Sequence, residues 1–179
     1  MNFKEKFVTI LTKPDKFFDK IKSENKIKDA FSFLLTVSLV YLVATVFLIV
    51  TGPLASLGLA GIASVSLFTW AMSILLMFVM AAIVSTTAKL LGGKGDYAKA
   101  FNALVYGSLP SQILGWLPFV GFLFAVWSVY LQTKGVSKLY KMGMFRSLVA
   151  VISPTIIALV LIVIFASSLI NGSLQPMSG

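Results

Sequence analysis

Long uncharged stretches dominate the pattern of hydrophobic and polar positions along this chain. Three of them, at 30–50, 66–88 and 148–170, contain no Lys, Arg, Asp or Glu. A helix needs about 20 apolar residues to cross the roughly 30 Å hydrocarbon core of a bilayer. Each of the three stretches therefore predicts a transmembrane helix.

A fourth uncharged stretch, 100–132, is long enough to form two shorter helices. The sequence Gly-Trp-Leu-Pro at 115–118 interrupts it and favours a turn at that point. We therefore predict spans at 98–116 and 118–138, which makes 30–170 an all-α domain of five transmembrane helices. Because the segments on both sides of this stretch are basic, a re-entrant hairpin is the alternative to two full spans.

The N-terminal segment 1–29 predicts two amphipathic helices. Phe3, Phe7, Ile10 and Leu11 lie at positions that share one helix face. A second helix is expected from Pro14, because proline fits the first helical turn. Lys-rich, Phe-bearing helices often lie in the headgroup layer of an anionic leaflet. Lipid anchoring and docking of a partner protein are both open, and the residues expected to make the contact are Phe3, Phe7, Lys13, Lys16, Phe17 and Phe18.

The distribution of charge predicts the orientation in the membrane. The 15 Lys and Arg outnumber the 6 Asp and Glu, giving a formal charge of +9. All of these residues lie in three blocks, at 4–29, 89–99 and 134–146, which alternate with the uncharged stretches. Basic loops stay on the cytosolic side. We expect a multi-pass protein of the cell membrane with a cytosolic N-terminus, an outer connection at 51–65 and an outer tail at 171–179. Charge in membrane loops gives no reason to expect nucleic acid as a partner.

The residue types present restrict the available chemistry. The chain has no Cys and no His, and the predicted spans carry no acidic or basic side chain in their cores. These absences remove the usual zinc and haem ligands and the common general base. The string LGGKGD at 91–96 lacks the spacing of a phosphate-binding loop and predicts a turn. We expect no metal, no cofactor and no enzymatic activity; a surface site using Asp96 or Tyr97 is the remaining enzymatic alternative.

The third predicted span combines small, polar and helix-breaking residues. Small residues at four-residue intervals let helix backbones approach closely in lipid, and here they are Ala103, Gly107, Ser111 and Gly115. Pro110 and Pro154 each remove a helical hydrogen bond, which predicts kinks packed inside the bundle. Asn102, Tyr106 and Gln112 predict interhelical hydrogen bonds or, alternatively, a polar transport path. Association of several copies is a further open alternative.

Several short motifs resemble the Yip family (Ypt-interacting proteins) in its prokaryotic form. They are a basic N-terminal "P…FF…I" pattern, "YGSLP" in the third span, a "LPFVG" turn, a Trp in the fourth span and "KGVSKLY" after it. The resemblance implies a five-helix membrane domain with a cytosolic N-terminus. Eukaryotic members are associated with Rab-type GTPases and membrane traffic. Their "DLYGP" stretch is absent here, so GTPase binding is not carried over.

The leading hypothesis is a non-enzymatic scaffold or membrane-organising module of the Yip type. It is expected to contact anionic lipids of the cytosolic leaflet, with other membrane or cytosolic proteins as further partners. The alternative is a small transporter or channel with a path along the third and fourth spans.

Overall fold

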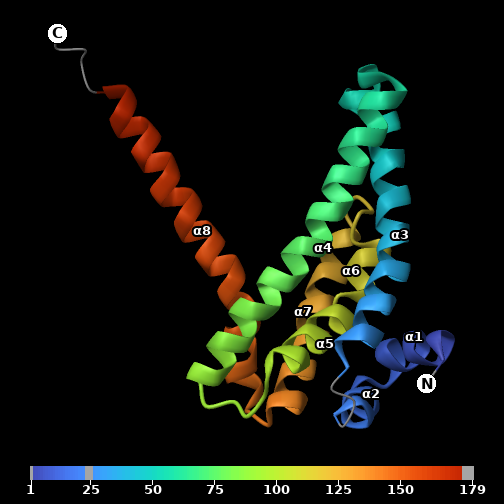
Figure 1. Ribbon diagram of the computed structural model, residues 1–179, viewed down its shortest axis with the longest axis vertical. Coiled ribbons are helices and arrows are strands. Elements are labelled where there is room, and N and C mark those ends of the chain that lie inside the picture. Colours follow the sequence, from blue (N-terminus) through green and yellow to red (C-terminus); the bar gives the residue numbers. More distant parts are fainter. Residues whose placement is uncertain (1, 23–25, 175–179) are drawn as a thin grey trace.

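The computed structural model describes residues 2–22 and 26–174, with side chains described as far as residue 168. Within these residues the chain is all-α, as predicted, and contains no strand. Figure 1 shows the arrangement of the helices. Their bounds are α1 Phe3–Thr12, α2 Pro14–Ile21, α3 Ile27–Thr51, the 3₁₀ helix η1 Pro53–Leu57, α4 Gly58–Leu90, α5 Tyr97–Gly107, α6 Leu109–Leu114, α7 Gly121–Tyr140 and α8 Met144–Leu174.

The antiparallel pair α3 and α4 forms the tallest part of the molecule (Figure 1). The two helices are joined by Gly52 and η1, and α4 already begins at Gly58, whose φ of 67° suits glycine at this junction. The predicted connection at 51–65 is therefore wrong in its second half, which is helical. Glycine and proline marked the turn correctly at Gly52 and Pro53, but Gly61 is accommodated within α4.

Among the residues that the structure describes, three helical segments are long and apolar enough to cross a bilayer. They are Ile27–Thr51, Pro53–Leu90 and Met144–Ser168. The chain is therefore a multi-pass membrane protein. Between the second and third segments, α5, α6 and α7 form a shorter hairpin that ends below the tip of the α3–α4 pair in Figure 1. In α7 the uncharged part, 121–133, would be only about 20 Å long. The count of five spans remains a prediction for this hairpin.

The hairpin is held together by close packing of α5 on α7. A side chain at Gly107 would place its Cβ 2.6 Å from the backbone nitrogen of Gln132, and one at Gly135 would lie 3.0 Å from Cβ of Ala103. Farther along the hairpin, the amide of Ser111 in α6 donates a hydrogen bond of 2.9 Å to Ser128 Oγ in α7. Ala103, Gly107 and Ser111 thus face α7 at the expected four-residue intervals, whereas Gly115 lies in the turn beyond α6.

Both prolines of interest lie where the helical hydrogen-bond ladder changes. Pro110 sits in the first turn of α6, directly after the break between α5 and α6 at Ser108. Pro154 lies inside α8, which continues without interruption. There the Ser153 hydroxyl donates a hydrogen bond of 2.8 Å to the Ala150 carbonyl. That carbonyl has no amide donor in the helix, because Pro154 lacks an N–H group. The Ser153 oxygen also accepts a hydrogen bond of 3.0 Å from the Thr87 hydroxyl, which links α8 to α4.

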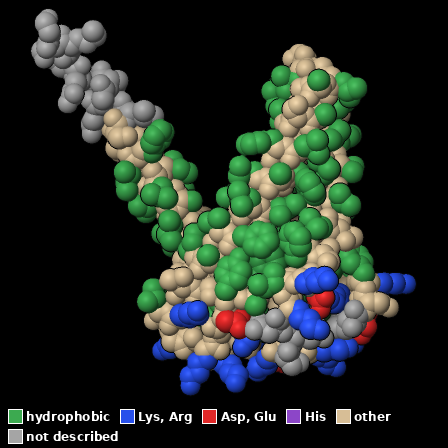
Figure 2. Space-filling view, viewed as in Figure 1, with side chains coloured by type: hydrophobic (Ala, Val, Ile, Leu, Met, Phe, Trp, Pro, Cys, Tyr) green, Lys and Arg blue, Asp and Glu red, His purple; other side chains and the backbone are tan. Residues whose placement is uncertain are grey.

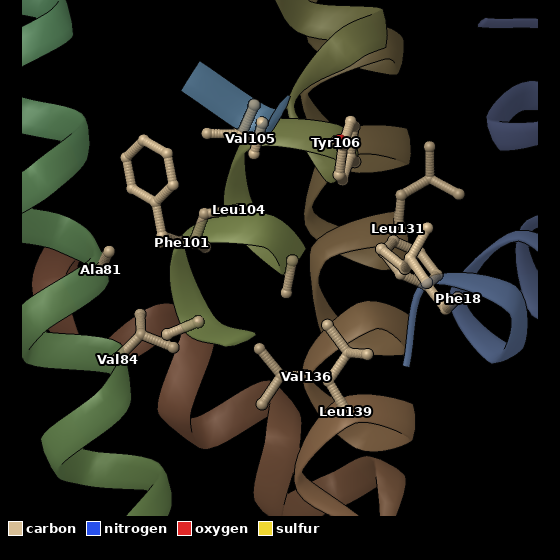
Figure 3. Close-up of a cluster of buried hydrophobic side chains, with 14 of the residues drawn as sticks. Phe18, Ala81, Val84, Phe101, Leu104, Val105, Tyr106, Leu131, Val136 and Leu139 are labelled. Atoms are coloured by element: carbon tan, nitrogen blue, oxygen red, sulfur yellow. The ribbon is translucent and has the colours of Figure 1, made fainter. Parts of the chain in front are cut away.

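The hydrophobic core lies in the lower half of the molecule as drawn. Figure 3 shows side chains of α2, α4, α5 and α7 meeting there, among them Phe18, Val84, Phe101 and Leu131. Above this core α8 diverges from α4, and its side chains from Ile156 to Ser168 are exposed. The packed unit therefore consists of the α5–α7 hairpin, the adjoining parts of α3, α4 and α8, and the two N-terminal helices.

Close packing at Gly107 predicts a large difference between two glycines. Gly107→Val should lower the stability by about 1–3 kcal/mol, because its Cβ meets backbone atoms of α7 that cannot move aside. Gly143→Val is the matched control, since nothing lies within 4 Å of a Cβ there. Thermal unfolding in detergent micelles measures both. Equal melting temperatures for the two variants would contradict the close α5–α7 contact.

Candidate functional site

Charged side chains gather at one end of the molecule, which we call the basic end (Figure 2). Three parts of the chain meet there: helices α1 and α2, the connection between α4 and α5, and the connection between α7 and α8. The opposite, upper part carries hydrophobic side chains on the face shown in Figure 2. Lysine ammonium groups bind phosphate and carboxylate groups as compact positive charges. The basic end is therefore the candidate functional site.

Helices α1 and α2, which we call the basic platform, are docked onto the bundle. Phe17, Phe18 and Ile10 are fully buried, and the Phe17 ring packs edge-on against Tyr106 with centroids 5.0 Å apart. The Phe18 ring fills the space above Gly135 of α7, where an added Cβ would lie 2.8 Å away. Burying a phenylalanine side chain contributes roughly 1.5–3 kcal/mol. The platform is therefore part of the folded core.

This docking corrects the predicted role of two residues. Phe17 and Phe18 were expected to contact lipid or a partner, but both are covered by the chain itself. Together with Ile21 they form the buried face of α2, and the surface that covers this face comes from α5 and α7. Phe3 and Phe7 lie on α1, with Phe3 46% exposed and Phe7 partly buried against the core. Lys13 and Lys16 are exposed.

Ion pairs tie α2 to the end of α7. Lys134 Nζ lies 3.0 Å from Asp15 Oδ2, and Lys138 Nζ lies 3.0 Å from Asp19 Oδ2 and 3.7 Å from Asp15 Oδ1. The acids lie one helical turn apart on α2 and the lysines one turn apart on α7, so the two rows match. A further pair, Lys20 with Glu5 at 3.4 Å, joins α2 to α1. No local pattern in the sequence indicates these pairs.

The paired lysine also changes the acidity of Asp15. The hydrogen bond from Lys134 lowers the pKa of the Asp15 carboxyl below its ordinary value and outweighs the partial desolvation, which acts in the opposite direction. The charge of Lys138 adds to the lowering. Asp15 therefore stays ionised, and its ion pairs persist, well into the acid range.

The polar residues predicted in the third span lie in different surroundings. Tyr106 is buried beneath the platform. Lys6 Nζ donates a hydrogen bond of 3.2 Å to the Tyr106 hydroxyl and lies 5.5 Å from the centroid of its ring. Asn102 is also buried, at 3% exposure. Gln112 lies farther from the basic end and lines a separate cavity between α3, α4 and the α5–α6 junction. A transport path along the third and fourth spans stays an alternative prediction.

The glycine-rich string at 91–96 forms a seat for Tyr140, the last residue of α7. The Tyr140 ring is fully buried, and a Cβ at Gly95 would lie 2.6 Å from it. Its hydroxyl donates a hydrogen bond to the Asp96 carbonyl at 2.5 Å and accepts one from the Ser85 hydroxyl at 2.9 Å. Asp96 itself caps α5 by accepting from the Lys99 amide. This string is structural, and Tyr140 is a residue whose importance the sequence analysis missed.

Chemically, the basic end offers lysine side chains that can bind negatively charged groups. In the part of the chain that the structure describes, no cluster of three metal-ligating side chains is found. The acids Asp15 and Asp19 are engaged by α7, while Lys4, Lys13 and Lys16 are exposed at the platform surface. The arrangement suits reversible contact with a negatively charged surface.

Removal of the Asp15–Lys134 pair should loosen the platform. Asp15→Asn and Lys134→Gln are each expected to weaken docking by about 0.5–1 kcal/mol, because the pair is partly exposed to solvent. The double variant should lose little more than either single one. The measurement is the maleimide labelling rate of a cysteine placed at buried Ile21, with Lys16→Cys as the exposed reference. Strictly additive effects in the double variant would show that the two residues do not act together.

Acid should loosen the docking of the platform over a defined pH range. The Asp15 contribution is fully present above the ordinary pKa of 3.8 and is lost as the pH falls through its lower folded pKa. Spin labels at Lys22→Cys and Lys141→Cys report the separation of α2 from the end of α7, and the chain has no other cysteine. We expect the distance distribution to broaden below about pH 4, and Asp15→Asn to reduce that change. An identical acid response in the Asp15→Asn variant would contradict this assignment.

Comparison with known proteins gives one match. The model of the Yip1 domain family matches residues 8–166, which include the platform and nearly all of the membrane domain. No curated protein and no solved structure matches the chain significantly. The match extends over most of the chain and agrees with the resemblance drawn from "YGSLP" and "LPFVG". This chain belongs to the Yip1 domain family.

Proposed function

We propose that this protein is a non-enzymatic membrane scaffold whose basic end faces the cytosol and binds the anionic lipid surface of the inner leaflet. The observation that carries the proposal is the docked basic platform. Its buried side is fixed by Phe17 and Phe18, so its lysines are held at a constant position relative to the transmembrane helices. A scaffold needs such a fixed surface, because a freely hinged helix would position nothing.

The exposed side of α1 supports contact with lipid. Val8 is 48% exposed and lies on the side of α1 opposite the buried Ile10. Phe3 is 46% exposed, and its ring packs against Phe33 of α3 with centroids 5.1 Å apart. Lys4, Lys13 and Lys16 are exposed on the same platform. Apolar side chains inserted at the headgroup boundary and lysines near anionic lipids act together, and each lysine contributes about 1 kcal/mol. Phe3 thus keeps the role that Phe17 and Phe18 lose.

The charge pattern supports the orientation. All 15 Lys and Arg lie at or near the basic end in sequence blocks that flank the apolar helices, and positively charged loops are retained in the cytosol. Localisation in the cell membrane with the basic end inside is part of the proposal. The absence of enzymatic activity is proposed from the lack of His and Cys and from the uncharged helix interiors.

Anionic lipid should draw α1 into the headgroup layer. An environment-sensitive dye on Val8→Cys is expected to shift its emission to the blue when the intact protein is moved from phosphatidylcholine vesicles to vesicles that also contain phosphatidylglycerol. Added salt should reduce the shift, because it screens exposed charges. Replacement of Lys4, Lys13 and Lys16 by Gln should abolish it.

The matched control replaces three lysines at the α4–α5 connection and the helix ends beside it with Gln, namely Lys89, Lys94 and Lys99. This variant has the same net charge as the platform variant, and its dye shift should stay close to that of the parent protein. Identical emission in neutral and anionic vesicles would refute the proposed lipid contact. Equal loss in both lysine variants would show that net charge, and not the platform, attracts the lipid.

A further inference from the structure

A polar cavity of about 290 Å³ lies between α3, α4 and the α5–α6 junction. Its polar lining consists of Ser38, Tyr41, Ser73, Ser108, Ser111 and Gln112. Ser38 lies about 17 Å along α3 from its first residue, and Ser73 lies about 26 Å along α4 from its last. The cavity is therefore near the middle of the apolar part of these helices. Its size is close to the lower end of the roughly 300–1,000 Å³ range of ligand sites.

The serine hydroxyls of the cavity already have acceptors for their hydrogens. Ser38, Ser73 and Ser108 donate to carbonyl groups of their own helices at 3.0, 2.7 and 2.9 Å. Their oxygens then act as acceptors: Ser38 Oγ receives the Trp70 indole at 2.9 Å, and Ser108 Oγ receives Gln112 Nε2 at 2.6 Å. The hydrogen bonds between Trp70 and Ser38 and between Gln112 and Ser108 fix the polar wall.

Gln112 has unused hydrogen-bonding capacity in this wall. Its Oε1 atom is buried and has no hydrogen-bond partner among the residues that the structure describes. Leaving a buried amide oxygen without a donor is costly, so such atoms usually receive a hydrogen bond from a ligand or water. The Nε2 group has two hydrogens, of which the contact with Ser108 uses one. Gln112 can thus accept one hydrogen bond and donate another.

The surroundings of the cavity indicate an uncharged ligand that comes from the bilayer. No acidic or basic side chain lines it, so a charged group would be desolvated there without a counter-charge. Tyr41 and Met77 on its wall are only half-buried, and the next residues, Val40 and Leu76, are exposed apolar side chains. The open side of the cavity is therefore bordered by surface that suits hydrocarbon.

We propose that this cavity binds the head group of an uncharged, hydroxyl-bearing lipid of the diacylglycerol type. The lipid hydroxyl donates to Gln112 Oε1, and an ester oxygen accepts from the second Nε2 hydrogen or from the Tyr41 hydroxyl. Apolar chains extend from the open side, past Met77, into the bilayer. This site is distinct from the basic platform and needs no anionic lipid.

Photolabelling of the intact protein in nanodiscs tests the site. The probes are a diacylglycerol and a phosphatidic acid with the same chains, each carrying a diazirine close to the ester group. We expect the diacylglycerol to label peptides covering 34–41, 73–77 and 108–112 several times more than the phosphatidic acid. Gln112→Leu should lower that labelling about fivefold through loss of its hydrogen bonds.

Two further variants keep the test decisive. Ser73→Leu fills the cavity from a different helix and should also reduce labelling, so a folding defect of one variant does not remove the test. Ser167→Leu, on the exposed part of α8, is the control and should leave labelling unchanged. Melting temperatures establish that each variant is folded. Equal labelling by the two probes, or labelling that folded cavity variants leave unchanged, would overturn the proposal, including the case in which the cavity holds water alone.

Discussion

The close approach of α5 to α7 is the contact on which the rest of the structure depends. Gly107 lets α5 lie against the backbone of α7, and Gly135 leaves room for both Ala103 and the ring of Phe18. One small residue therefore serves two contacts, one between the membrane helices and one with the platform. In lipid, where helices gain no hydrophobic stabilisation from each other, such close packing supplies much of the association energy.

The docked platform follows from this contact. With Phe18 above Gly135 and Phe17 against Tyr106, the acidic side of α2 is brought to the end of α7, where Lys134 and Lys138 complete the ion pairs. The apolar contacts contribute most of the stability, since partly exposed ion pairs contribute little. The ion pairs select the register, because a shift of α2 by one turn would leave one acid without its lysine.

Local features of the fold could be predicted from the sequence, and long-range contacts could not. The length of the uncharged stretches located α3, α4 and α8, and proline located the start of α2 at Pro14. The apolar face of α2 was also evident, yet the pattern could not show that α5 and α7 cover it. The same limit explains why the importance of Tyr140 was not predicted. Gly95, against which its ring packs, lies 45 positions earlier in the chain, and no local pattern connects the two residues.

The central claim is that the basic platform is a fixed part of the membrane domain. Hydrogen–deuterium exchange of the intact protein in nanodiscs tests it most directly, because the amides of α2 exchange slowly only if the helix is held against α7. We predict protection of 17–21 comparable to that of the adjoining part of α7, and loss of this protection in Gly135→Leu, which removes the space for Phe18. Rapid exchange throughout α2 in the parent protein would contradict the account.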